Sequence, residues 1–310
     1  MNCRGLITLL ATLGLPNARA EEQTFERGLM GTRFAITCHF GDPAKAKQAA
    51  DAAFEEGERI NLVASDYIAG SELLAIGNHP AGIAVAVSPL LFRLLSEARD
   101  LAGKTDGSFD PTLGPLTRLW RESRRRNHLP DPAVMETARA ATGWKNLKLN
   151  SHDLTVVFSK SAMRLDLGGI AKGQAADAML IIMQKHGIPR TCITAGGDIR
   201  LGDSPPGSSG WKIGVRTFNN EHDTRILELA HCAVSTSGDL HQSITIDDIR
   251  YSHIIDPATG LGLTRDVAAT VIAPTATVSD ALATACCVAG PEKARAMAIA
   301  AGATEVFLDE

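Results

Sequence analysis

Aromatic side chains, charge of one sign and long hydrophobic runs are all scarce in this chain. The 310 residues are 5% aromatic, 45% hydrophobic and 21% charged, which is typical of a globular protein and excludes a disordered or fibrous chain. The 31 basic and 35 acidic residues give a net charge of −4, so nucleic acid is not expected as a partner. Outside the N-terminus no apolar run approaches the roughly 20 residues that span a bilayer, so the mature chain should have no transmembrane segment.

Paired cysteines and the common catalytic signatures are missing too. After residue 20 the chain has an odd number of cysteines and no Cys-x-x-Cys pair, which favours neither a disulfide framework nor a zinc site. These cysteines are Cys38, Cys192, Cys232, Cys286 and Cys287. The last two lie in the apolar run ALATACCVAG, where we expect small buried hydrophobic side chains and disfavour a redox pair. The patterns GxGxxG, HExxH and GxSxG and the P-loop are absent, so no familiar nucleotide, zinc-protease or serine-hydrolase site is indicated.

Residues 1–20 have the features of an export signal. Arg4 supplies a positive charge, a short apolar stretch follows, and Ala18-Arg19-Ala20 is a small-x-small cleavage site. A buried first helix is the alternative, which a glycine and a proline near the cleavage site disfavour. Cys3 lies too early for lipid anchoring. We therefore predict cleavage after residue 20 and an exported, periplasmic product that is not a lipoprotein.

The pattern of the remaining chain predicts an α+β fold. Apolar residues at helical spacing and helix-end signals predict helices over 44–60, 89–103, 131–143, 170–187, 280–290 and 291–302. Alternating residues predict strands over 154–158 and 211–216, a hairpin over 147–158 with its turn at 150–153, and an exposed loop over 204–210. Strands in consecutive runs favour mixed or antiparallel sheets with packed helices over a regular βαβ array. Residues 21–310 show no clean linker, and we treat them as one domain.

Seven short polar and glycine-rich clusters lie beside the ends of these elements. A single cluster is usually a turn, but seven in one chain indicate a long polar ligand that the backbone approaches closely. The clusters are MGT (30–32), TDGSFDPT (105–112), DLGGIAKG (166–173), AGGD (195–198), STSGD (235–239), HIIDPATG (253–260) and SDALAT (279–284).

The DLGGIAKG cluster has the properties of a phosphate-binding turn. Gly168 and Gly169 allow close approach of a ligand, and the helix that follows points free N–H groups at it. Lys172 adds an ammonium one turn into the helix, which suits a phosphate. The alternative is an ordinary helix start, with Asp166 as the cap and Lys172 in water, and these residues alone leave both open.

Two further clusters offer a metal site and a base. Asp280 and Thr284 are four residues apart, so they share one helix face, and their oxygens with a backbone carbonyl would suit Mg²⁺. On the other reading, Ser279 or Asp280 simply caps the helix. His253 precedes a rigid Asp-Pro turn, where an imidazole near a pyrophosphate could take a proton from an incoming hydroxyl; a structural histidine is the alternative.

Taken together and in this order, the clusters resemble the ApbE-type FAD:protein FMN transferases. The resemblance runs from Met30 to Thr284 and includes ASDYIAGSELLAIGN (64–78) and TDGSFDPTLGPLTRLW (105–120). The family implies two closely associated lobes around FAD, which is a substrate. It also implies Mg²⁺-dependent transfer of FMN to a Thr or Ser hydroxyl of an acceptor protein, with AMP leaving.

The resemblance also implies roles for individual residues. His253 would be the catalytic base, and the Gly169 carbonyl, Asp280 and Thr284 would hold the metal. The expected FAD contacts are Met30, Tyr67, Ser108, Phe109, Asp110, Asp166, Lys172 and Ile254. Three positions depart from the family pattern: Gln174 replaces an aromatic residue, Ser279 an alanine, and Gly262-Leu263-Thr264 a proline-containing turn, so we expect a looser loop beside His253.

Two other functions remain open on sequence alone. A Mg²⁺-dependent FAD pyrophosphatase would use the same site with water as the acceptor. A periplasmic FAD-binding protein without chemistry is less favoured, because it would need neither the metal residues nor a positioned histidine.

Overall fold

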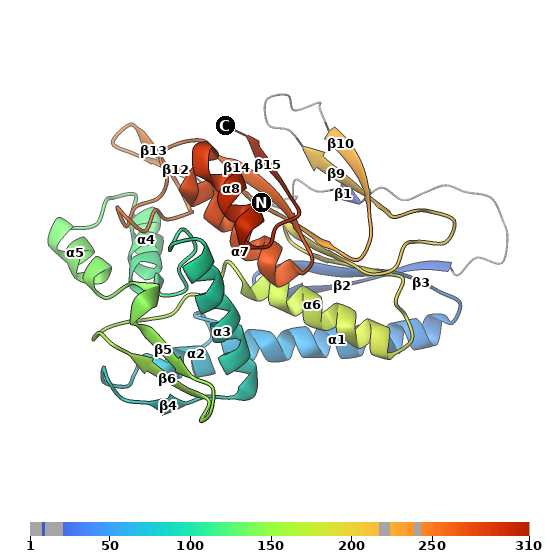
Figure 1. Cartoon of the computed structure of the whole chain (residues 1–310), viewed down its shortest axis with the longest axis horizontal. Helices are drawn as coiled ribbons and strands as arrows, with labels where there is room; N and C mark the ends of the chain where they lie inside the picture. Colours follow the sequence, from blue (N-terminus) through green and yellow to red (C-terminus); the bar gives the residue numbers. More distant parts are fainter. Residues whose placement is uncertain (1–7, 10–20, 217–223, 239–242, 310) are drawn as a thin grey trace.

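A seven-stranded antiparallel sheet forms the centre of the computed structural model, which describes residues 8–9, 21–216, 224–238 and 243–309 (Figure 1). Its spatial order is β15-β14-β11-β8-β7-β3-β2. These strands are β2 (Glu21–Leu29), β3 (Thr32–Phe40), β7 (Thr191–Ala195), β8 (Asp198–Leu201), β11 (Ala233–Gly238), β14 (Ala268–Ala273) and β15 (Glu305–Asp309). The neighbours are all antiparallel, which confirms the α+β prediction.

Three smaller sheets surround the central one. They are β1-β9-β10 (Thr8–Leu9, Trp211–Arg216, Thr224–Leu229), β12-β13 (Ser243–Ile246, Ile249–Ser252) and β4-β6-β5 (Val85–Ala86, Thr155–Phe158, Leu147–Asn150). The predicted 147–158 hairpin forms, but its turn lies one residue later than expected, because Leu154 adopts a φ of 50° and joins the turn. The 204–210 loop forms as predicted, although Pro205 and Gly210 are buried in it.

The helices largely follow the sequence signals that predict them. They are α1 (Pro43–Ala64), α2 (Glu72–Ile76), α3 (Pro89–Lys104), α4 (Gly114–Arg126), α5 (Pro132–Ala140), α6 (Ala171–Lys185), α7 (Ala276–Ala289) and α8 (Pro291–Ala301), with a 3₁₀ turn at Trp144–Asn146. At α1, Asp42 accepts hydrogen bonds from the first free N–H groups and Pro43 occupies the first turn. Ser88 and Pro89 do the same for α3.

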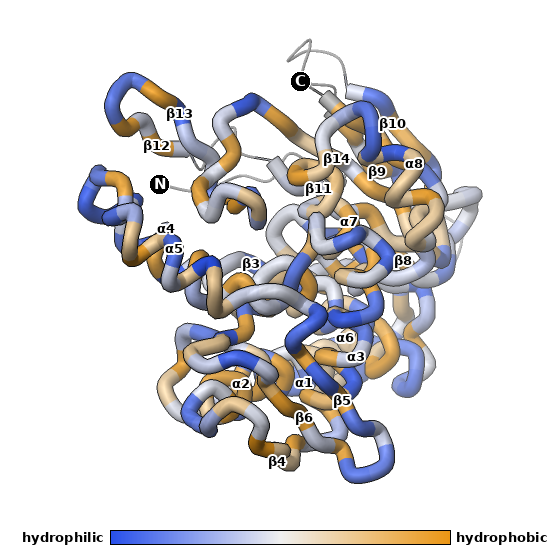
Figure 2. The backbone as a smooth tube through the Cα atoms, turned by 60° about the vertical axis from the view of Figure 1, so that its left-hand side comes forward, coloured by the Kyte–Doolittle hydropathy of each residue, from blue (hydrophilic) through white to orange (hydrophobic). Residues whose placement is uncertain are grey.

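The described residues form four hydrophobic clusters, and the two largest are the cores of two lobes. In one, α1 and α6 lie side by side against β3 and β7. In the other, α3, α7 and α8 pack with β5 and β6, and Ile254 joins them. Figure 2 shows hydrophobic segments gathered where α1, α3 and α6 meet. In Figure 1, α4, α5 and β4–β6 lie on the far side of α3 from the central sheet. The predicted packing of helices in two associated lobes is therefore present.

The two lobes are joined where the N-terminal ends of α6 and α7 cross. A Cβ on Gly173 would lie 2.1 Å from the Ala276 carbonyl oxygen, so only glycine allows this approach. Asp177 accepts hydrogen bonds from the N–H groups of Ala276 (3.0 Å) and Thr277 (2.8 Å), the first residues of α7. One carboxylate of α6 thus caps α7 and fixes its direction.

Several elements differ from the sequence predictions. α7 begins at Ala276, four residues before the predicted start, because Thr275 is its cap and accepts from Val278 N–H. Neither Ser279 nor Asp280 caps the helix, so that alternative is wrong. α4 was not expected, since its arginine-rich sequence looks solvent-exposed; Leu116, Trp120 and Ser123 nevertheless form a buried stripe.

The remaining predictions concern the cysteines and the N-terminus. All five cysteines after residue 20 are free thiols. Cys286 and Cys287 are buried, as predicted; Cys38 and Cys192 are buried too, and Cys232 is half-buried. Apart from Thr8–Leu9, which pair with β9, the predicted signal lies outside the described residues. In the part of the chain that the structure describes, no helix is long and apolar enough to cross a bilayer.

Replacing Gly173 with alanine should force α6 and α7 apart. The new methyl group would collide with backbone, which cannot rotate away, so we expect Gly173→Ala to destabilise the fold by about 1–3 kcal/mol. The measurement is the free energy of unfolding in urea. Gly103→Ala in α3 is the matched control: its methyl group would meet Trp144 at an ordinary 3.5 Å, so it should be neutral or stabilise by up to about 1 kcal/mol. Equal effects of the two changes would contradict this account.

Candidate active site

An ammonium shared between two buried carboxylates lies at the crossing of α6 and α7. Lys172 Nζ is 3.1 Å from each Asp280 oxygen and 3.2 Å from Asp198 Oδ2. The side chains of Asp280 and Asp198 are 3% and 4% exposed, whereas that of Lys172 is 27% exposed. Asp280 also accepts the Gly173 N–H at 3.1 Å. Lys172 is therefore not in water, and that alternative is wrong.

The charges in this group shift one another's pKa. Burial alone would lower the pKa of Lys172, but Asp198 and Asp280 outweigh it and hold that pKa above its ordinary value. Burial and the neighbouring Asp280 raise the pKa of Asp198 to about 7, although Lys172 opposes the shift. Asp198 Oδ2 is close enough to the ammonium for ion pairing, yet makes no well-aligned hydrogen bond among the described residues.

Gly169, Asp280 and Thr284 converge beside this ammonium. Asp280 and Thr284 lie on one face of α7, and a Cβ built on Gly169 would be 3.4 Å from Thr284 Oγ1. Within the described residues no three His, Cys, Asp or Glu side chains form a metal-binding group, so a metal here would rely on one carboxylate, a hydroxyl and a backbone carbonyl. These hard oxygen donors fit Mg²⁺, and Lys172 already shows that Asp280 binds a cation.

The surrounding clusters join this centre through short contacts. Ser235 and Ser279 hydroxyls are 2.7 Å apart, and Ser237 and Thr284 hydroxyls 3.2 Å apart, so β11 lies along α7. The Thr236 N–H donates to the Gly197 carbonyl at 3.1 Å, which attaches the AGGD turn. Clusters distant in sequence thus meet at one place. Ser279, one of the departures from the family pattern, makes one of these contacts.

The MGT cluster forms the tight turn between β2 and β3. Met30 has a φ of 51° and Gly31 a φ of 72°, the conformation of a two-residue hairpin turn. Met30 is half-buried and packs against both hydrophobic cores. Thr32 lies beside the AGGD turn, since a Cβ on Gly196 would be 2.9 Å from its hydroxyl. This turn therefore reaches the junction of the two lobes.

In the TDGSFDPT cluster, the Asp110 carboxylate makes hydrogen bonds that stabilise the local fold. Asp110 accepts hydrogen bonds from the Thr112 N–H (2.8 Å) and hydroxyl (2.6 Å) and from the Trp144 N–H (3.0 Å). Burial raises the pKa of Asp110 despite these donors. Phe109 is buried with its ring 3.4 Å from a Cβ built on Gly169, and Ser108 is half-buried. Phe109 thus borders the centre, while both oxygens of Asp110 already have partners.

A second shared cation connects Tyr67 with Asp166. Arg121 forms ion pairs with Asp66 and with Asp166, the latter at 2.8 Å, and its guanidinium lies 4.3 Å from the centroid of the Tyr67 ring. Tyr67 is 74% exposed. Asp166 also accepts the Gly168 N–H at 2.8 Å. It braces the glycine turn and does not cap α6, whose N-cap position is Ile170 with no side-chain bond, so the capping alternative is wrong.

The loop that carries His253 rests on α4. The Trp120 indole N–H donates to the Ser252 carbonyl at 3.0 Å, and a Cβ on Gly262 would lie 2.8 Å from that indole. The Ser252 N–H donates to the Leu263 carbonyl at 2.7 Å, so backbone pairing closes the loop; whether it is looser than in other family members stays a prediction. His253 is half-buried and Ile254 is buried in the core of the α3 lobe.

Sequence reasoning missed three charged residues of this region. Asp198 is the last residue of the AGGD cluster, for which the sequence suggested no role for any individual residue. Arg121 directly follows TDGSFDPTLGPLTRLW and was hidden in an arginine-rich run; Asp66 precedes Tyr67 in a second recognised segment. Composition offered no signal for Arg121, because only the folded chain brings Asp66 and Asp166 to it.

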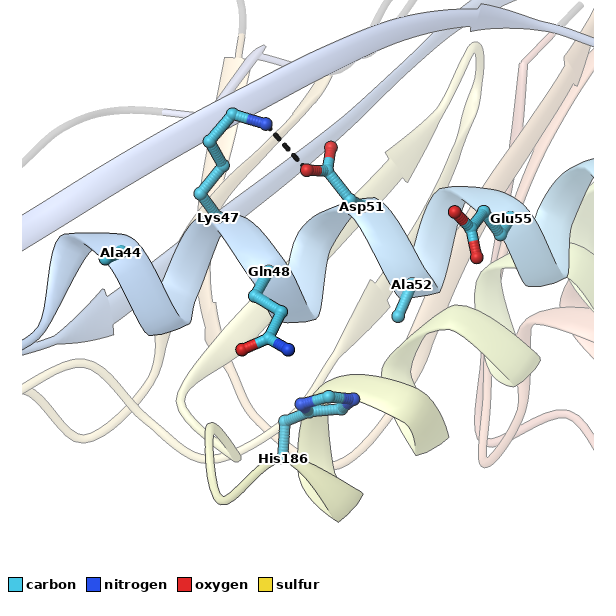
Figure 3. Close-up of a pocket in the computed structure, with 7 residues that line it drawn as sticks. All are labelled: Ala44, Lys47, Gln48, Asp51, Ala52, Glu55 and His186. Carbon is cyan, nitrogen blue, oxygen red and sulfur yellow. Dashed lines mark hydrogen bonds and ion pairs between the residues drawn. The ribbon is translucent and has the colours of Figure 1, made fainter.

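A surface hollow of about 440 Å³ lies elsewhere, between α1 and the residue that follows α6 (Figure 3). Lys47 and Asp51 form an ion pair across its rim at 2.6 Å, and His186 faces α1. Its lining residues are Ala44, Lys47, Gln48, Asp51, Ala52, Glu55 and His186. None of the seven clusters contributes to it, so it is not the candidate site.

The comparisons with known proteins agree with this geometry. The sequence profile of the ApbE family matches residues 30–308. The chain belongs to the ApbE family. It is 30% identical, over 94% of its length and 86% of the relative's, to a protein from Treponema pallidum (strain Nichols) named FAD:protein FMN transferase. A protein of the same name from Vibrio cholerae is 33% identical over 78% of this chain and 73% of its own.

Solved structures of ApbE proteins have the same fold. The apo form of flavinyl transferase ApbE from Pseudomonas stutzeri superimposes with a TM-score of 0.83 at 28% identity, covering 94% of this chain and 91% of its own. Flavin transferase ApbE from Vibrio cholerae gives a TM-score of 0.81 at 30% identity, with 93% of each chain covered. The α+β architecture of this ApbE protein is thus shared along nearly its whole length.

Removing the Asp110 carboxylate should weaken the fold. Asp110→Ala leaves the Thr112 and Trp144 N–H groups without their acceptor, so we expect a loss of about 1–3 kcal/mol in the free energy of unfolding, measured in urea. Asp110→Asn, which keeps one acceptor oxygen for Thr112, should lose less. Unchanged stability in Asp110→Ala, combined with weaker FAD binding, would instead make Asp110 a ligand contact.

Proposed function

We propose that this ApbE protein transfers the FMN half of FAD to a Thr or Ser hydroxyl of an acceptor protein. The hydroxyl oxygen attacks the phosphorus on the FMN side of the pyrophosphate, a phosphoester forms, and the bond to the AMP phosphate breaks. The observation that supports this most is the group of Lys172, Asp280, Thr284 and Gly169 at the N-terminal end of α6. It combines an oxygen set that can bind a cation with an ammonium that can bind a phosphate.

The FAD contacts in this proposal surround the junction of the two lobes. Lys172 would contact the pyrophosphate, with the glycine turn braced by Asp166 beside it. Tyr67 offers an exposed ring beside the Arg121 guanidinium, and the half-buried Met30 offers apolar surface. Phe109 is buried and would support the site from beneath Gly169. Ser108 and Ile254 belong to the same proposed set, although Ile254 contributes chiefly to the core. For Asp110 a supporting role toward its neighbours agrees better with its hydrogen bonds.

A magnesium ion is part of the proposal. The Gly169 carbonyl, the Asp280 carboxylate and the Thr284 hydroxyl would hold it, because hard oxygens are the ligands that Mg²⁺ prefers. When bound, the ion would neutralise charge on the pyrophosphate. Phosphoryl transfer depends mainly on such neutralisation and on positioning, and a redox cofactor is not required.

His253 is proposed as the base that activates the acceptor hydroxyl. The loop is held by Trp120 and by its own backbone pairing, so the imidazole has a fixed and partly exposed position. A half-buried imidazole can take the hydroxyl proton while the oxygen attacks phosphorus.

We further propose that residues 21–310 form one exported domain. The basic, apolar and small-residue pattern of residues 1–20 supports a signal that is removed after Ala20. N-terminal sequencing of periplasmic material should then begin at Glu21, and an intact Met1 would contradict export.

The proposed reaction predicts a covalent mass gain on an acceptor. Purified protein, FAD, Mg²⁺ and a flavin-acceptor domain with a threonine target are incubated, and the acceptor is weighed by mass spectrometry. We expect a gain of one FMN, with AMP in solution, and no gain when Mg²⁺ is chelated.

Other outcomes of this assay separate the alternatives. Free FMN and AMP without acceptor modification, also when other acceptor domains are supplied, would indicate the pyrophosphatase. Intact FAD that stays bound in the presence of Mg²⁺ would indicate a carrier without chemistry.

Removing the imidazole of His253 should stop transfer but leave FAD binding intact. We expect His253→Ala to lower the transfer rate by roughly 10²–10⁴-fold, the usual contribution of a general base, measured as labelled acceptor against time. His186→Ala, at the surface hollow behind α6, is the control and should leave the rate unchanged. A normal rate in His253→Ala would make His253 structural.

A further inference from the structure

The ammonium of Lys172 lies across both carboxylate oxygens of Asp280, where a cation bound to that carboxylate in bidentate fashion would also lie. The Lys172 Nζ lies 3.1 Å from each of the two Asp280 oxygens, so both oxygens already have a cation as partner. Its third strong partner is Asp198 Oδ2 at 3.2 Å, and the Gly168 carbonyl oxygen lies at 3.3 Å. The bidentate position on a buried carboxylate is therefore taken by a group of this chain.

In the part of the chain that the structure describes, Asp198 forms an ion pair with no cation other than Lys172. Asp198 begins β8, which also contacts α7, and its Oδ2 has no well-aligned hydrogen-bond donor among the described residues. When Asp198 is ionised, two buried carboxylates share one ammonium, and one negative charge is left uncompensated. Such a group attracts a second cation, since an uncompensated charge in the interior is costly.

The lysine side chain can change partners without a change in the backbone. Its four-carbon stem is flexible, and the side chain is about a quarter exposed, whereas both aspartates are nearly inaccessible. Asp280 is further fixed by the Gly173 N–H. The Lys172 ammonium can therefore move between the two carboxylates, whereas the two aspartates are buried and held in place.

We propose that the Lys172 ammonium is an internal competitor for the metal site, and that Asp198 is the positioning residue that receives it when a divalent cation takes Asp280. Asp198 itself is not a metal ligand here; it lowers the cost of displacing Lys172 and leaves the ammonium directed at the site of the pyrophosphate. The inference rests on the proposed function, because the cation site on Asp280, Thr284 and Gly169 is part of it.

If Lys172 competes with the metal and Asp198 positions Lys172, substitutions of these two residues should change the metal affinity in opposite directions. Lys172→Met removes the competitor, so binding should become tighter by about tenfold or more. Asp198→Asn removes the second carboxylate, so the ammonium stays on Asp280 and binding should weaken by about tenfold. In the Lys172→Met background the Asp198→Asn change should cost less than about threefold, because its effect passes through Lys172.

The measurement uses Mn²⁺ as the probe, which prefers the same oxygen ligands as Mg²⁺. The full-length protein without FAD or acceptor is titrated, and the electron paramagnetic resonance signal of free Mn²⁺ gives the dissociation constant. Lys185→Met, the same substitution at the exposed C-terminal end of α6, is the matched control and should leave the constant unchanged. Circular dichroism confirms that each variant is folded.

Each outcome decides the inference. Unchanged or weaker binding in Lys172→Met overturns competition, and unchanged binding in Asp198→Asn overturns the role of Asp198. An Asp198→Asn effect of equal size in both backgrounds would make Asp198 a direct ligand and overturn the positioning role. Should Lys172→Met not fold, Asp198→Asn still tests the inference alone. Because no FAD or acceptor is present, the expected binding pattern combined with failed FMN transfer would overturn only the proposed function.

Discussion

The close contact between the N-terminal ends of α6 and α7 is the constraint on which the rest of the candidate site depends. It requires a residue without a side chain at Gly173, because the Ala276 carbonyl oxygen occupies the place of a Cβ. Asp177 then caps α7 from the side of α6, and Asp280 accepts the Gly173 N–H. The two helices are thereby locked in register by backbone groups, and Lys172 faces Asp280 as a consequence.

What the sequence could predict here was local. Helices α1 and α3 follow from their apolar spacing and from the Asp-Pro and Ser-Pro pairs at their starts, and the β5–β6 hairpin follows from alternation and a polar turn. The sequence carried no such signal for the order of the seven-stranded sheet. That order depends on pairing between distant segments, and β3 and β7, for example, are more than a hundred residues apart. The glycine-rich clusters could be recognised from the sequence because each one consists of a few consecutive residues.

The assignments that failed were those that depended on a distant partner. On its own, DLGGIAKG allowed Asp166 as a cap and Lys172 in water, since nothing nearby in sequence shows that Arg121 binds the first and Asp198 the second. The same holds for Ser279, whose hydroxyl partner comes from β11. Residue type and spacing can therefore nominate a site, whereas the folded chain decides which charge neutralises which.

The charge balance of the site supports the proposal that an anionic nucleotide binds there together with a metal. Two cations of the chain each bind two carboxylates: Lys172 binds Asp198 and Asp280, and Arg121 binds Asp66 and Asp166. Burial, and after it the proximity of Asp166, raises the pKa of Asp66, and burial and Asp280 do the same for Asp198, so in both clusters the shared cation only partly offsets these effects. A pyrophosphate would enter a region where the chain's own cations are already committed. A divalent cation on Asp280 would reverse the sign of the local field and release Lys172 toward the phosphates, so the requirement for a metal would arise from the protein's charges as much as from the chemistry of phosphoryl transfer.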